Sequence, residues 1–74
     1  MRLSDLQDKN VINIKDGKLI GNIIDIMITK DGILESFIVE KTKFLLSKFS
    51  SSGEIEIRYN QIIKIGDDVI LVDI

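Results

Sequence analysis

Residues 16–40 read DGKLIGNIIDIMITKDGILESFIVE, and this stretch decides the fold. It contains two Asp-Gly pairs, Asp16-Gly17 and Asp31-Gly32, and each pair stands between apolar runs. Such a pair is the strongest short hairpin signal, because Asp and Gly tolerate the positive φ that a type I′ turn requires. The stretch therefore predicts two successive β-hairpins that share the strand 19–29.

The shared strand is apolar on both of its faces. Ile24, Ile26 and Ile28 alternate on one face, and Ile23 and Met27 lie on the other. A Gly near its start, at position 21, permits a sharp bend or a bulge. A strand with two apolar faces that begins at such a kink is typical of one that curls around a small barrel.

Short strands are predicted on both sides of this stretch. Their expected ranges are 11–14, 33–40, 54–59, 62–65 and 69–72. In the range 54–59, Ile55, Ile57 and Tyr59 alternate with charged residues and are expected to point inward. About six short antiparallel strands at close spacing predict a single all-β domain over residues 1–74, a small barrel or sandwich.

The composition favours β structure and leaves few apolar side chains for anything other than the core. The chain of 74 residues has sixteen Ile, seven Leu and four Val but no Ala. Ile and Val suit a pleated, half-buried surface, whereas Ala favours helices. Because small domains bury a low fraction of their surface, nearly all aliphatic side chains are needed in the core, and little apolar surface remains to line a deep pocket.

Charge and residue types exclude several classes of function. Ten basic residues against twelve acidic ones give a net charge of −2, which disfavours nucleic-acid binding, since that function relies on clustered Lys and Arg. The absence of Cys and His removes disulfides, thiolate nucleophiles, the commonest general base and zinc ligand sets. We therefore expect neither an enzyme nor a cofactor or metal site.

Targeting signals are also lacking. No apolar run approaches the length of about 20 residues that a transmembrane helix needs. The first five residues, MRLSD, lack the apolar core of a signal peptide. We expect a cytoplasmic protein without a transmembrane segment.

The remaining polar candidates have structural explanations. Asp25 is expected at a strand end or barrel rim, because an unpaired buried charge costs too much free energy. Asp67 and Asp68 resemble a metal-binding pair, but adjacent residues in a tight turn usually face solvent. Arg58 and Tyr59 suggest base stacking, yet proteins that bind single strands interleave several aromatic and basic residues.

Residues 41–53 form the one segment without strand alternation, and they are the candidate for function. Here apolar side chains stand among Lys residues, a pattern that fits a cover over the barrel opening, a protein interface or weak contact with a membrane surface. The predicted partner-binding residues are Lys43, Phe44, Leu45, Leu46, Lys48 and Phe49. If the strands fill the core, these residues need another surface, and a second copy in a two-fold homodimer is the expected one.

Several stretches resemble PRC-barrel proteins, in particular the small YlmC/YmxH-type sporulation proteins. The resemblance is carried by MRLSDL at 1–6, DGKLIGNIID at 16–25, GILESFIV at 32–39 and QIIKIGDDVILV at 61–72. It implies a PRC-type β-barrel and a role as an adaptor that binds a protein partner, associated with sporulation. The segment 41–53 departs from the family pattern.

An Sm-like RNA-binding barrel is the alternative. The length, the number of strands and the sequence IRYNQI at 57–62 are similar to that family. The acidic balance and the hairpin GDDV at 66–69 stand against it. A salt-dependent RNA gel shift separates the two hypotheses.

Overall fold

Turns at the two Asp-Gly pairs place three strands side by side in the computed structural model, which describes residues 1–41 and 53–74. They are β1 (Asn10–Asn13), β2 (Leu19–Ile28) and β3 (Leu34–Lys41), and they pair antiparallel in that order. Gly17 and Gly32 have φ values of 70° and 82°, which confirms the predicted positive φ.

The turn type differs from the expectation. A type I′ turn needs positive φ at two successive residues, but among the described residues only glycines have it. In the second turn the Gly32 N–H donates to Thr29 O at 2.9 Å, and the Thr29 N–H donates to Ile33 O at 2.8 Å. The loop therefore has three residues with Gly in the left-handed position, the next most common hairpin after the two-residue type.

The other three strands extend this sheet at both sides. β4 (Glu54–Arg58) pairs antiparallel with β3, and β6 (Val69–Val72) lies between β1 and β5 (Ile62–Ile65). The order of the six strands is β4-β3-β2-β1-β6-β5. Because β6 runs parallel to β1, the sheet is mixed, and the expectation of antiparallel strands alone was wrong.

The parallel pair arises from a connection that local turn signals do not specify. A 3-10 helix, η1 (Tyr59–Gln61), carries the chain from β4 to β5, and the β5–β6 hairpin then meets β1. At the two ends of the pair, the Asn10 N–H donates to Asp68 O at 3.1 Å and the Ile14 N–H to Val72 O at 2.8 Å. Turn residues fix neighbours in sequence, whereas a parallel partner depends on a long crossover.

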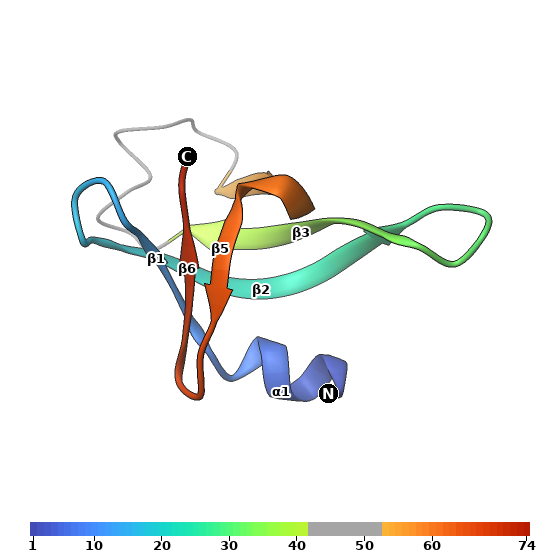
Figure 1. The fold of residues 1–74 in the computed structure, drawn as a ribbon, viewed down its shortest axis with the longest axis horizontal. Coiled ribbons are helices and arrows are strands. Elements are labelled where there is room, and N and C mark those ends of the chain that lie inside the picture. The colour runs from blue at the N-terminus through green and yellow to red at the C-terminus, as the bar shows by residue number, and fades with distance from the viewer. Residues whose placement is uncertain (42–52) are drawn as a thin grey trace.

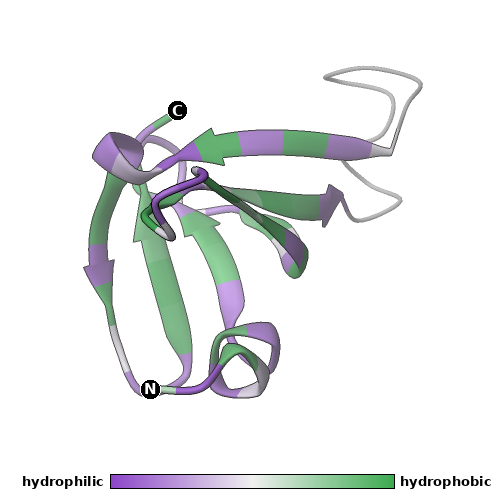
Figure 2. Ribbon diagram, turned by 90° about the vertical axis from the view of Figure 1, so that its right-hand side faces the viewer, coloured by the Kyte–Doolittle hydropathy of each residue, from purple (hydrophilic) through white to green (hydrophobic). Residues whose placement is uncertain are grey.

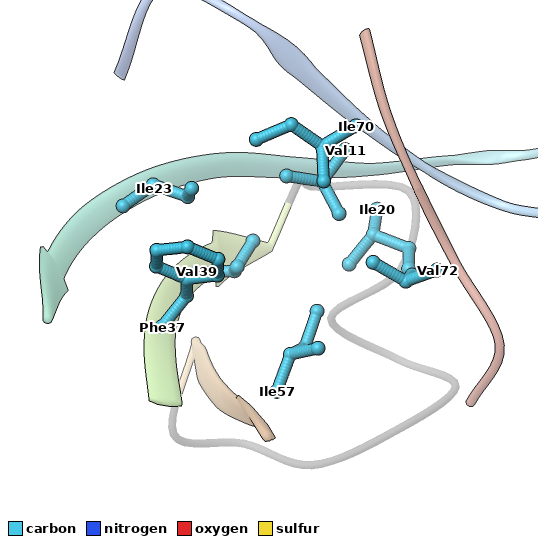
Figure 3. Close-up of a cluster of buried hydrophobic side chains, with 8 residues drawn as sticks. All are labelled: Val11, Ile20, Ile23, Phe37, Val39, Ile57, Ile70 and Val72. Atoms are coloured by element: carbon cyan, nitrogen blue, oxygen red, sulfur yellow. The ribbon is translucent and has the colours of Figure 1, made fainter. Parts of the chain in front are cut away.

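The sheet curls so that side chains from distant strands share one core (Figure 3). Ile57 comes from the edge strand β4, and Ile70 and Val72 come from β6 near the other edge. The buried cluster consists of Val11, Ile20, Ile23, Phe37, Val39, Ile57, Ile70 and Val72. The fold is therefore barrel-like in its core, although the pairing leaves β4 and β5 as the two ends of one sheet.

Gly21 confirms the predicted bulge near the start of β2. Val11 pairs with Gly21 and Ile12 with Leu19, so Ile20 is an extra residue in β2. A Cβ at position 21 would lie 1.8 Å from the carbonyl oxygen of Glu40 in β3. The strands approach closely here, and only Gly fits.

Two further elements complete the fold. The short helix α1 (Leu3–Gln7) lies near the N-terminus (Figure 1), and its first turn is held by a hydrogen bond of 2.8 Å from the Arg2 N–H to Asp5 Oδ2. Its Leu6 packs against the core. Among the described residues, no helix has the length and apolar character needed to cross a membrane.

The alternation predicted for 54–59 ends one residue early. Figure 2 shows it as bands of opposite hydropathy along the strand that follows the grey trace, which is β4. Ile57 is buried and Ile55 half-buried, as expected. Tyr59 is 60% exposed, because the chain turns into η1 at this residue, so its predicted inward position was wrong.

Candidate interaction surface

The predicted partner-binding residues fall outside the described part of the chain. They all belong to residues 42–52 and are Lys43, Phe44, Leu45, Leu46, Lys48 and Phe49. Their role stays a prediction. On either side of them, the Lys41 N–H donates to Gly53 O at 2.8 Å, which continues the pairing of β3 with β4 beyond Glu54.

Among the described residues, the largest group of exposed apolar side chains lies on the β2–β3 arm, which we define as residues 24–36. The end of this hairpin projects beyond the other elements along the longest axis of the molecule (Figure 1). Met27 is 47% exposed, Ile28 58% and Ile33 63%, and Ile24 is exposed as well. The arm therefore presents apolar surface to solvent in a domain that has few such side chains to spare.

Two irregularities in the β2–β3 pairing explain this exposure. Ile23 pairs with Val39 and Asp25 with Ile38, so Ile24 is an extra residue that breaks the alternation. Ile26 then returns to the core side, where it packs against the buried cluster. The prediction that Ile24, Ile26 and Ile28 share one face was wrong for Ile24, because Ile24 is itself the extra residue of the bulge.

The second irregularity lies nearer the tip of the arm. Met27 pairs with Ser36 and Ile28 with Leu34, so Glu35 is the extra residue in β3. Leu34 still reaches the core cluster, whereas Ile28 opposite it remains exposed. The core thus ends within the arm.

The surface of β2, β3 and β4 that points away from the core is built from three rows of paired residues, and we term it the outer face. The rows are Asn22–Glu40–Glu54, Asp25–Ile38–Glu56 and Met27–Ser36–Arg58. Residues that pair directly across antiparallel strands share one face of the sheet. Four of these nine positions carry carboxylates and Arg58 carries the one cation, so the outer face is acidic.

Hydrogen bonds hold parts of this surface in place. The buried Ser36 Oγ donates to the Glu56 carboxylate at 2.5 Å. Asp25 Oδ1 accepts from the Ile26 N–H at 2.8 Å, and Asp25 is exposed. Asp25 lies next to a bulge within β2 and not at the strand end expected from the sequence.

The Asp67–Asp68 turn, which joins β5 to β6, uses its main chain to anchor the start of β1. Lys9 Nζ donates to Asp67 O at 2.6 Å, and Asn22 Nδ2 donates to Lys9 O at 3.0 Å. The two Asp side chains are exposed, as expected for a tight turn. Within residues 1–41 and 53–74, no pocket is found and no group of three ligating side chains is placed to hold a metal.

Sequence reasoning missed the exposed side chains of the arm, because it assigned nearly all aliphatic side chains of the chain to the core. One signal was available: the predicted strand 19–29 is longer than both strands expected to pair with it, 11–14 and 33–40. When a strand is longer than the strands that pair with it, the core does not cover the side chains at its far end. Met27, Ile28 and Ile33 lie in that uncovered part.

Comparison with known proteins agrees with the fold. The family model described as PRC-barrel domain matches residues 1–74. The chain is 39% identical over 72 residues to a protein of Bacillus subtilis (strain 168) named "Probable sporulation protein YlmC", which covers 95% of this chain and 88% of that protein. The family match and the relative agree with the resemblance found at residues 1–6, 16–25, 32–39 and 61–72. They favour the PRC-barrel family over the Sm-like family. This chain belongs to the PRC-barrel domain family.

Proposed function

We propose that this chain is a non-catalytic protein-interaction module that acts in sporulation and works as a homodimer. The observation that carries the proposal is the exposed apolar surface of the β2–β3 arm, where Met27, Ile28 and Ile33 are each about half exposed or more. Several exposed apolar side chains on one hairpin of a small domain indicate a site of contact with another protein. The printed name of the relative, a probable sporulation protein, supports the process.

The sequence of residues 42–52 supports a second contact. It carries the apolar residues Phe44, Leu45, Leu46 and Phe49 together with Lys43 and Lys48. The fully buried core of the described part already draws on β1, β2, β3, β4 and β6. We infer that these apolar residues meet a second copy of the chain, because closed two-fold pairing is the commonest assembly of soluble proteins. The expected cytoplasmic location stays a prediction.

A pull-down from sporulating cells tests the interaction role of the arm. The bait is the intact protein, and the test variant is Ile28→Ser/Ile33→Ser. Ile63→Ser is the matched control, because Ile63 is 55% exposed but lies on β5, away from the arm. We expect the intact protein and the control to retain the same specific partner and the arm variant to lose it. Equal recovery by all three would contradict the role of the arm.

The homodimer has its own test. The intact protein should sediment as a dimer at micromolar concentration, and Phe44→Ser/Leu46→Ser should shift it toward monomer with an unchanged β-sheet signal in circular dichroism. The triple variant Phe44→Ser/Leu45→Ser/Leu46→Ser, used as bait beside the arm variant, separates a partner held by this segment from one held by the arm. A wild-type monomer at about 100 μM, where a micromolar Kd gives mostly dimer, would refute the homodimer.

A further inference from the structure

The outer face of β2, β3 and β4 has a charge that the chain itself complements. Its four carboxylates lie on two neighbouring rows, with Asp25 and Glu56 on either side of Ile38 and with Glu40 paired directly to Glu54. Residues 42–52 carry two Lys and no carboxylate, so the other residues of the chain carry a net charge of −4. The basic part of the chain and its acidic outer face therefore have opposite charge.

The outer face and residues 42–52 also both carry apolar side chains. On the outer face, Met27 is 47% exposed and Ile38 is half-buried between the carboxylates. In residues 42–52, Phe44, Leu45 and Leu46 stand between Lys43 and Lys48. An apolar centre with charges around it is the usual composition of a protein interface.

The outer face is open to another molecule. Asp25, Met27, Glu40 and Glu56 are all exposed in the single chain. Ser36, which lies among them, is buried and bonded to Glu56, so this part of the surface is held in a fixed arrangement. A surface that is both ordered and exposed binds without a large loss of conformational entropy.

We propose that the outer face of one copy binds residues 42–52 of a second copy. The inference rests on the proposed homodimer and names the surface that receives the predicted partner-binding residues. A two-fold arrangement makes the contact reciprocal, since each copy gives one basic segment and offers one acidic face. The carboxylates Asp25, Glu40 and Glu56 pair with Lys43 and Lys48 of the other copy, and Met27 and Ile38 contact its apolar residues.

A charge-swap experiment tests the proposal. One variant reverses the face, Glu40→Lys/Glu56→Lys, and a second reverses the segment, Lys43→Glu/Lys48→Glu. Each variant alone should dimerise at least about tenfold more weakly than wild type, because like charges then meet across the interface. An equimolar mixture of the two should recover association as a heterodimer, detected by native mass spectrometry and sedimentation.

The controls keep the outcome clear. Asp67→Lys/Asp68→Lys makes the same change in net charge at an exposed turn whose main chain provides the structural contacts, and it should dimerise like wild type. Circular dichroism and melting curves check each fold. If the Lys variant of the face does not fold, Glu40→Gln/Glu56→Gln replaces it, since amides keep an acceptor for Ser36 Oγ and remove only the charge. This neutral variant is tested alone and not in the mixture, and it should dimerise more weakly than wild type.

The outcomes separate this inference from the proposed function. A wild-type monomer refutes the homodimer and the inference together. A wild-type dimer that the face variant also forms refutes the inference and leaves the homodimer standing. A mixture that fails to recover association excludes the pairing between copies, whereas recovery in the mixture alone supports it.

Discussion

The two halves of β2 carry similar side chains in opposite environments. In the first half, Ile20, Gly21 and Ile23 are buried, whereas in the second half Ile24 and Ile28 are exposed. The first half pairs with β1 on one side and β3 on the other, while the second half pairs with β3 alone. Apolar residues are enough to make a strand, but strands on both sides and a layer above are needed to make a core.

Gly21→Ala is expected to have the largest effect on this comparison, because it disrupts the buried half. The added Cβ would lie 1.8 Å from Glu40 O, a main-chain atom that moves only if β2 and β3 separate. We expect a loss of at least about 4 kcal/mol in the free energy of unfolding, comparable to the whole stability of so small a domain. Chemical denaturation measures the loss.

Gly66→Ala is the matched control for this prediction. A Cβ there meets its nearest atom, Val69 O, at 3.4 Å, and Gly66 does not have positive φ. We expect a change within about 1 kcal/mol of wild type. If both variants were equally stable, the close approach of β2 and β3 at Gly21 would be wrong.

Neighbouring Ala substitutions compare the two halves directly. Ile23→Ala removes a side chain that is 2% exposed and should cost about 2–4 kcal/mol, since it leaves a cavity in the core. Ile24→Ala removes a side chain that is 40% exposed and should cost less than about 1 kcal/mol. Equal losses in thermal denaturation would mean that the bulge at Ile24 is misplaced.

The existence and limits of the strands were predictable from sequence. The ranges 62–65 and 69–72 are confirmed without change, 19–29 and 54–59 each end one residue early, and 11–14 and 33–40 are each shifted by one residue. Turn residues and alternation are local properties, so they can be read from neighbours in sequence. Ile57 was assigned correctly to the core for the same reason.

The predictions that were wrong concern features that depend on contacts between residues distant in the sequence. The parallel pairing of β6 with β1 follows from the path of the chain through η1, which no turn motif specifies. The bulges at Ile24 and Glu35 depend on the register against another strand, and each reverses the face of the residues that follow. The acidic outer face was not predicted, because its rows combine residues of three strands, and residues 42–52 separate two of these strands in the sequence.

Gly32→Val probes the turn that carries the exposed half of β2. Gly32 has a φ of 82°, which a β-branched residue adopts only at a cost, although no atom lies within 4 Å of the added Cβ. The expected loss is about 1–3 kcal/mol from backbone strain alone. Gly32→Asn should lose less, because Asn tolerates this conformation. A melting curve that Gly32→Val leaves unchanged would place the turn elsewhere.

Ile28→Thr should have the smallest effect, and it tests whether the outer half of β2 belongs to the core at all. Thr keeps the branching that favours a strand, and Ile28 is 58% exposed in the single chain. At low protein concentration, where a dimer dissociates, we expect a change in unfolding free energy within about 0.5 kcal/mol, as for other surface substitutions. A loss of about 2 kcal/mol there would show that Ile28 is buried within its own chain. A loss that appears only as concentration rises would show burial between copies, because association stabilises the folded state by mass action.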